Sequence, residues 1–211
     1  MEAPGPETVS RAPARAWVRL ALVFYAAMLA LALLWREAWL GQSLAYASPA
    51  DAQEGVRWGT DLGLGIAAGL AAVAVSRWTT RRTHVGRRLA RALAAALGPL
   101  SLRQCLVLAL ASGLGEEALF RGAVQPSLGL FGASLLFGAV HFSPRRDLWS
   151  WSLLAVVAGL GLGILFETTG NLVAPVAAHA TLNAINLRLL VKEYGEDSRA
   201  SARCRLSSLP R

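Results

Sequence analysis

The sequence predicts an all-α protein, a polytopic bundle of about six membrane-spanning helices. Three observations predict this fold class. Of the 211 residues, 55% are hydrophobic, and they stand in long blocks instead of alternating with polar residues. The arginines concentrate in the stretches between alternate blocks. The tryptophans lie at or near the ends of the blocks, where a bilayer meets water.

Six apolar segments are the candidates for these helices. A helix needs about 20 residues to cross the hydrocarbon core, and four segments fit this length easily. The third is long enough to tilt, and the fourth is short, so we expect the fourth to be buried among its neighbours. Backbone groups in hydrocarbon must be bonded within the segment, and the alternation of barrel strands is absent, so helices are expected. The segments span residues 16–35, 58–76, 100–125, 130–142, 148–166 and 172–191.

The basic residues predict the orientation. With the N-terminus inside, sixteen of them fall on the inner side and only Arg36 and Arg57 on the outer side. This bias predicts an integral, multi-pass protein of a bacterial inner membrane with both termini in the cytoplasm. The inner residues are Arg11, Arg15, Arg19, Arg77, Arg81, Arg82, Arg87, Arg88, Arg91, Arg145, Arg146, Lys192, Arg199, Arg203, Arg205 and Arg211.

The net charge of +8 does not indicate nucleic-acid binding. The arginines separate apolar blocks and are not interleaved with aromatic residues, so the expected partner is the lipid bilayer. We expect the first segment to be an uncleaved span, because its apolar stretch is longer than that of a usual signal peptide.

Three regions are expected along the chain. Residues 1–99 form a two-helix membrane region with a basic cytoplasmic loop, 100–191 a core, and 192–211 a basic, disordered tail. The basic stretch around Arg87, Arg88 and Arg91 suits an amphipathic helix on the inner surface or a solvated loop equally well. Glycines recur at a spacing of four, which permits close helix contact. These pairs are Gly59 and Gly63, Gly65 and Gly69, and Gly159 and Gly163.

Costly polar groups interrupt three of the apolar segments. Such groups inside a membrane are rare and usually functional. At a rise of 1.5 Å per residue, four of them lie roughly 13–19 Å from the outer turns, near the middle of a ~30 Å core. These four are Glu116, His141, His179 and Asn183. The set consists of Glu116, Glu117 and Arg121 in the third segment, His141 in the fourth, and His179 and Asn183 in the sixth.

Helical spacing divides this set. Glu117 and Arg121 are four residues apart, so they can pair on one face, and Glu116 points elsewhere. His179 and Asn183 also share a face. The alternative is a buried hydrogen-bond network that only holds the helices together, but structural contacts in membranes more often use Ser, Thr or Asn.

The set suits peptide-bond hydrolysis. A carboxylate beside a histidine can deprotonate a water molecule, which here assigns Glu116 with His141. The side chains of His179 and Asn183 can donate hydrogen bonds to the oxyanion that forms on the scissile carbonyl.

The same residues leave a zinc site open. Glu116, His141 and His179 have the ligand types of a catalytic Zn²⁺ site. Zinc would then need a separate base, and Glu117, the remaining carboxylate, is committed to Arg121 by its spacing. We therefore favour a metal-free mechanism and keep Zn²⁺ as the alternative cofactor.

At these residues the sequence resembles the CPBP family of intramembrane proteases, the CAAX-type prenyl proteases and bacteriocin-processing enzymes that are also called the Abi family. The family pattern is Glu-Glu-x-x-x-Arg, then Phe-x-x-x-His, then His-x-x-x-Asn. All three motifs stand here in order within about residues 100–190, as Glu116-Glu117 to Arg121, Phe137 to His141, and His179 to Asn183. The flanks Ser134 to Phe142 and Thr169 to Pro175 also resemble the family.

The resemblance implies roles for these residues. By analogy, Glu116 and His141 activate water, His179 and Asn183 hold the oxyanion, and the remaining pair stabilises the arrangement. Descriptions of the family as metalloproteases do not decide the metal. Many members have seven or eight helices, so we expect the N-terminal part of this chain to differ from theirs.

The leading hypothesis is therefore a membrane-embedded endopeptidase that cleaves a membrane-associated or prenylated protein or peptide. The family also includes scaffold and bacteriocin-immunity proteins, so a protein that acts by binding is the second hypothesis. A small transporter with a buried proton path is the third, although the sequence shows no internal repeat. The substrate and its cleavage site are not specified by the sequence.

Overall fold

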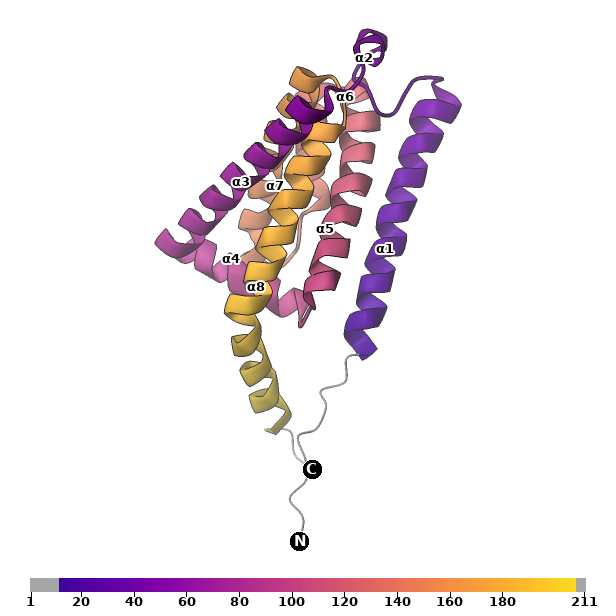
Figure 1. The fold of residues 1–211 in the computed structure, drawn as a ribbon. Helices are drawn as coiled ribbons and strands as arrows, with labels where there is room; N and C mark the ends of the chain where they lie inside the picture. Colours follow the sequence, from indigo (N-terminus) through magenta and orange to yellow (C-terminus); the bar gives the residue numbers. More distant parts are fainter. Residues whose placement is uncertain (1–11, 208–211) are drawn as a thin grey trace.

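The described chain is an all-α bundle, as the sequence predicts. The computed structural model describes residues 12–207, with the side chains of 16–146 and 148–194. The elements are α1 (Ala12–Leu33), the π-helical turn η1 (Leu34–Trp39), α2 (Pro49–Glu54), α3 (Trp58–Arg82), α4 (His84–Leu97), α5 (Leu102–Glu117), the π-helical turn η2 (Ala118–Val124), α6 (Gln125–Val140), the short η3 (Arg146–Leu148), α7 (Trp149–Thr169) and α8 (Val173–Ser207) (Figure 1).

Four stretches of the described chain are long and apolar enough to cross a membrane. They are Ala16–Trp39, Trp58–Arg82, Leu102–Val140 and Trp149–Thr169. The third stretch covers two of the predicted segments. These two segments are separated at Gly129, where φ is 73° and the backbone is not helical. Helix α8, which carries His179 and Asn183, is not among the four. The membrane class is therefore confirmed, whereas the count of about six spans is not.

Small residues bring the long helices into close contact. A Cβ atom on Gly69 would lie 2.6 Å from the carbonyl oxygen of Ala178, so α3 and α8 meet almost backbone to backbone. Neighbouring helices also occupy the space where a Cβ atom would lie at Gly65 on α3 and at Gly159 and Gly163 on α7. Open space surrounds the same position at Gly59 and Gly63. The predicted close contact is thus correct for two of the three glycine pairs.

The basic stretch around Arg88, for which the sequence allows a helix or a solvated loop, forms the helix α4. It begins where the Thr83 hydroxyl accepts a hydrogen bond from the backbone N–H of Gly86, at 2.9 Å. It then crosses one end of the bundle between α3 and α5 (Figure 1). Leu89 and Ala92 are buried against Leu148, next to Trp151, so the apolar face of this amphipathic helix packs on the bundle.

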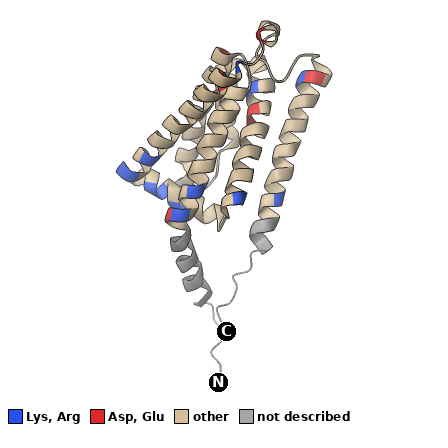
Figure 2. Ribbon diagram, in the orientation of Figure 1, with Lys and Arg blue, Asp and Glu red and all other residues tan. Residues whose placement is uncertain are grey.

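The charges are distributed unequally between the two ends of the bundle. Figure 2 shows basic residues along α4 and at the adjoining ends of α1, α3, α5 and α8. We call this the arginine-rich end. The opposite end carries Arg36 and Arg57, as the sequence analysis predicts, together with acidic residues.

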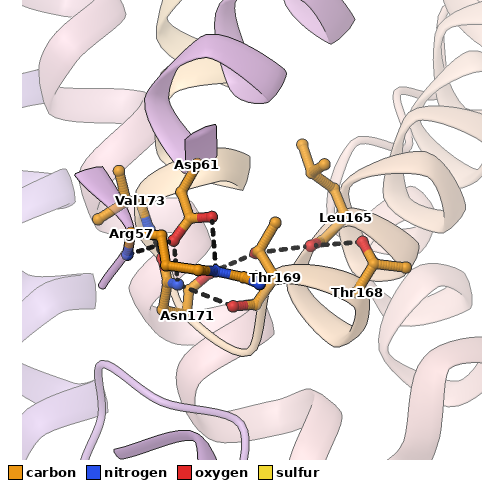
Figure 3. A network of polar contacts seen from close by, with 7 residues as sticks. All are labelled: Arg57, Asp61, Leu165, Thr168, Thr169, Asn171 and Val173. Carbon is orange, nitrogen blue, oxygen red and sulfur yellow. Dashed lines mark hydrogen bonds and ion pairs between the residues drawn. The ribbon is translucent and has the colours of Figure 1, made fainter. Parts of the chain in front are cut away.

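A buried polar network closes the opposite end (Figure 3). Asp61 on α3 has no exposed surface, and its Oδ2 accepts hydrogen bonds from the Asn171 side chain at 2.7 Å and from the Arg57 backbone N–H at 3.0 Å. Asn171 also accepts from the backbone N–H of Val173, where α8 begins. These bonds fix the turn between α7 and α8 on α3, and with it the position of α8 along the bundle.

Helix α8 extends to Ser207, into the segment 192–211 for which the sequence predicts a disordered tail. An established helix lengthens without a new nucleation step, and no proline follows until Pro210. Residues 1–11 and 208–211 lie outside the described range.

Candidate active site

The candidate site lies where α5 passes into η2. Helix α5 starts with a capping box formed by Ser101 and Gln104, and it ends at Glu117. The next seven residues form the π-helical turn η2, which contains Arg121. Such turns are rare and occur frequently at functional sites. No feature of the local sequence predicted this turn.

Glu117 joins two of the predicted site residues. Its Oε2 lies 3.1 Å from Nε of Arg121, so the ion pair expected from the four-residue spacing is present. Its Oε1 lies 2.7 Å from Nδ1 of His179 on α8. All three side chains are buried. The sequence analysis committed Glu117 to Arg121 alone, but a carboxylate has two oxygens and serves both partners.

Arg121 is held by more than its carboxylate. One terminal nitrogen, Nη2, donates to the carbonyl oxygen of Gly159 on α7 at 3.0 Å. Its guanidinium carbon lies 4.7 Å from the ring centroid of Phe137. This combination of an ion pair, a carbonyl and an aromatic face is what a buried guanidinium requires in place of water.

Glu116 faces away from Glu117 and toward His141, which ends α6. Its Oε2 lies 3.8 Å from Nε2 of His141 and has no hydrogen-bond partner among the described residues. The other ring nitrogen of His141, Nδ1, lies 2.7 Å from the carbonyl oxygen of Phe137. A carbonyl only accepts hydrogen bonds, so Nδ1 carries a proton, and Nε2 of the neutral ring is an acceptor. Two acceptors therefore face each other inside the bundle.

Helix α1 completes the wall beside Glu116. The Tyr25 hydroxyl lies within interaction range of the Glu116 carboxylate. The close approach depends on Gly115, where a Cβ atom would lie 2.7 Å from the carbonyl oxygen of Tyr25. Sequence analysis missed Tyr25, because its helix lies far from the motifs along the chain and one tyrosine in an apolar segment gives no signal.

Asn183 is not hydrogen-bonded to the Glu116–His141 pair. Its amide donates to the hydroxyl of Ser112 at 2.9 Å. Ser112 is buried on α5, four residues before Glu116, so the two share a helix face. Sequence analysis assigned no role to Ser112, although its position one turn before Glu116 was a usable signal.

Phe137 connects the two parts of the site. Its ring centroid lies 4.6 Å from that of His141 and 6.2 Å from that of His179. It also meets Phe120 edge to face at 5.0 Å. The motif analysis noted Phe137 without a role, and the structure shows that it packs against both imidazoles and the Arg121 guanidinium.

The donor atoms do not converge on one point in this structure. Among the described residues, no three His, Cys, Asp or Glu side chains come together in a way that could hold a metal ion. The Nδ1 atoms of His179 and His141 are bonded to the Glu117 carboxylate and the Phe137 carbonyl, and these bonds leave Nε2 of each ring for another partner, as in metal-ligating histidines. The metal-free mechanism and the zinc alternative therefore both stay predictions.

Taken together, the fold and the site define a bundle of membrane helices with a buried acid–base site. The comparisons agree with this class. Residues 98–185 match the family described as type II CAAX prenyl endopeptidase, Rce1-like, so this segment of the chain is similar to that family. It contains all six residues that the sequence analysis selected, and it excludes α1 to α4.

One curated relative is the uncharacterized protein YpbD of Bacillus subtilis (strain 168). It is 40% identical over 87 residues, which cover 40% of this chain and 44% of the relative. The match thus spans less than half of the relative's length. No solved structure matches the chain.

Proposed function

We propose that this chain is an intramembrane endopeptidase whose catalytic residues are Glu116 and His141. The observation that carries the proposal is a pair of acceptors 3.8 Å apart, Oε2 of the buried Glu116 and Nε2 of the half-buried His141. Two acceptors repel each other unless a donor lies between them. A water molecule that donates one O–H to each would satisfy both and would be activated for attack.

The remaining residues complete a hydrolytic mechanism. The water oxygen attacks the scissile carbonyl carbon, and its proton passes to Glu116 or His141. When the C–N bond breaks, this proton is transferred to the leaving amine. The Glu117 carboxylate accepts a hydrogen bond from Nδ1–H of His179. When the His179 ring is protonated, its second donor, Nε2–H, can stabilise the developing oxyanion. Arg121 orients Glu117 and is a positioning residue.

The substrate class follows from the family and the surroundings. The family description names CAAX prenyl endopeptidases, so we propose a membrane-associated or prenylated protein or peptide as the substrate. We also propose that the arginine-rich end faces the cytoplasm of a bacterial cell, as the excess of basic residues on one side indicates.

The proposal is tested with the purified full-length chain in liposomes. The probe is a farnesylated peptide that ends in a CAAX sequence, compared with the same peptide without the lipid. Glu116→Gln should abolish cleavage while the protein remains folded. The control is Glu167→Gln, which changes an exposed carboxylate on α7 that accepts a hydrogen bond from Gln125. Near-full activity of Glu116→Gln would refute the assignment.

The metal-free mechanism makes a separate prediction about Asn183. We propose that its amide, held by Ser112, acts as an oxyanion donor, and loss of one such donor typically lowers the rate by about 10²–10³. With zinc bound, the metal would polarise the carbonyl, so Asn183→Ala would be mild. Metal analysis of the purified protein accompanies the assay. One zinc per chain, with activity lost on chelation and restored by zinc, would overturn the metal-free mechanism.

A further inference from the structure

The exposed face of α4 forms a hollow lined by basic side chains. Its volume is about 800 Å³. Four of the lining residues recur at helical spacing and therefore share one face. The lining consists of His84, Arg87, Arg88, Arg91 and Ala92.

The polar atoms in this hollow that are free to meet a ligand are donors. Nη2 of Arg87 lies 3.2 Å from Nδ1 of His84. A guanidinium only donates, so Nδ1 is the acceptor, and the proton of the neutral imidazole is on Nε2. His84 is thus a donor toward the hollow, as are the three arginines. This role is not what the sequence suggests for a histidine in a basic stretch.

The arginines of the hollow have no acidic partner among the side chains that the structure describes. None of the acidic side chains that the structure describes forms an ion pair with Arg87, Arg88 or Arg91, whereas Arg77 on α3 is paired with Glu193 at 3.2 Å. Like charges three and four residues apart on a helix repel each other. An anion in the hollow would remove this repulsion and accept the free N–H groups.

The position of α4 identifies the source of the anion. The opposite face of α4 is buried in the bundle, and the adjoining end of α3 exposes Trp78, with 63% of its surface accessible, as does Val85 on α4 with 60%. An amphipathic helix with basic residues on one side and exposed apolar residues beside it is typical of the interface between headgroups and acyl chains. Bidentate guanidinium groups suit phosphate oxygens.

We propose that this hollow is a binding site for the phosphate group of an anionic phospholipid. The site lies outside the segment that matches the protease family, and it does not depend on the proposed activity. A bound headgroup would fix α4, and because α4 packs on α8, it would also support the adjoining end of the helix that carries His179 and Asn183.

The test is the affinity for a short-chain phosphatidylglycerol, measured by native mass spectrometry of the full-length chain in a neutral detergent. The triple variant Arg87→Gln, Arg88→Gln and Arg91→Gln should bind about a hundredfold more weakly, because each arginine near an anionic headgroup contributes about fivefold. The matched control removes the same number of charges from three separate helices, by Arg19→Gln, Arg103→Gln and Arg188→Gln, all at exposed positions. It should bind as the wild type does.

Two further measurements keep the outcome unambiguous. If the triple variant does not fold, the double variant Arg88→Gln and Arg91→Gln leaves Arg87 with its bond to the Arg81 carbonyl and should still lose about twenty-five-fold. Inorganic phosphate and phosphatidylcholine are measured in parallel and should bind more weakly than phosphatidylglycerol. Equal loss in the α4 variant and the scattered control would overturn the proposal, as would a site that binds inorganic phosphate but not phosphatidylglycerol.

Discussion

Glu117 determines how the buried charges of the site are arranged. It contacts a guanidinium through one oxygen and an imidazole through the other, without any exposed surface. Its neighbour Glu116 directs one oxygen at His141, and this oxygen has no hydrogen-bond partner among the described residues. Two adjacent residues with the same side chain therefore have different surroundings, because a step of one residue along a helix is a rotation of about 100°.

At this scale we predict that Arg121→Ala destabilises the protein by about 3–5 kcal/mol, because the Glu117 carboxylate would remain buried without its cation. The measurement is thermal unfolding in detergent together with the protein level in cells. Arg103→Ala, which removes an exposed arginine from the same helix region, is the control and should have little effect. Identical unfolding of the two variants would show that the ion pair does not stabilise the fold.

Tyr25→Phe should lower kcat about tenfold or more and leave KM unchanged. The substitution removes only the hydroxyl that neighbours Glu116, and a hydrogen bond to a charged group contributes about 1.5–3 kcal/mol. Because the ring and its packing on Gly115 stay, unfolding should not change. Phe24→Leu, at the exposed neighbour whose ring contacts Tyr25, is the control. An effect confined to KM would assign Tyr25 to substrate binding and contradict an action through Glu116.

At the scale of elements, the contact between α3 and α8 determines where His179 lies. Gly65 and Gly69 allow the backbones to touch at Ala174 and Ala178, and Ala178 directly precedes His179. At the far end, Asp61 and Asn171 tie the start of α8 to the same helix (Figure 3). Helix α3 thus positions the site, although none of the site's described side chains comes from α3.

Gly69→Ala should therefore destabilise the protein by about 1–3 kcal/mol and lower its activity. The new Cβ atom would lie 2.6 Å from a backbone oxygen that cannot rotate away, so the helices must separate. Gly63→Ala is an ideal comparison, because it adds the same methyl group on the same helix with nothing within 4 Å. Thermal unfolding and peptide cleavage are measured for both. Equal behaviour of the two variants would show that close packing here is not required.

At the scale of the whole molecule, the two ends of the bundle differ in character. One end gathers the arginines and α4, and the other is closed by neutral and acidic polar contacts around the turn before α8 (Figure 2). A membrane potential and anionic lipids act differently on two such ends. This asymmetry is the physical basis of the orientation that we propose.

Cysteine labelling tests that orientation. In a variant without Cys105 and Cys204, a cysteine at Gln53 should react with an impermeant maleimide on intact cells, because α2 lies at the end opposite the arginines. A cysteine at Arg82 should react only after the membrane is permeabilised. Both positions are exposed, so accessibility within the protein does not differ. Labelling of Arg82→Cys on intact cells would invert the proposed topology.

The sequence by itself determined what depends on short-range order. Long apolar blocks require helices in a membrane, so the class and the approximate position of most helices followed directly. The Glu117–Arg121 pair also followed, because residues four apart meet on any helix. The selection of all six site residues came from the cost of burying polar groups and from the order of the motifs, and their catalytic roles remain predictions.

Only the tertiary structure decided which helix faces meet. The bonds from Glu117 to His179 and from Asn183 to Ser112 join residues 62 and 71 positions apart, and their geometry depends on how α8 is rotated and shifted against α5. The π-helical turn η2, the approach of Tyr25 and the hollow on α4 depend on packing in the same way. Helical periodicity fixes which residues share a face, but the close packing of small residues between helices selects the partner of that face.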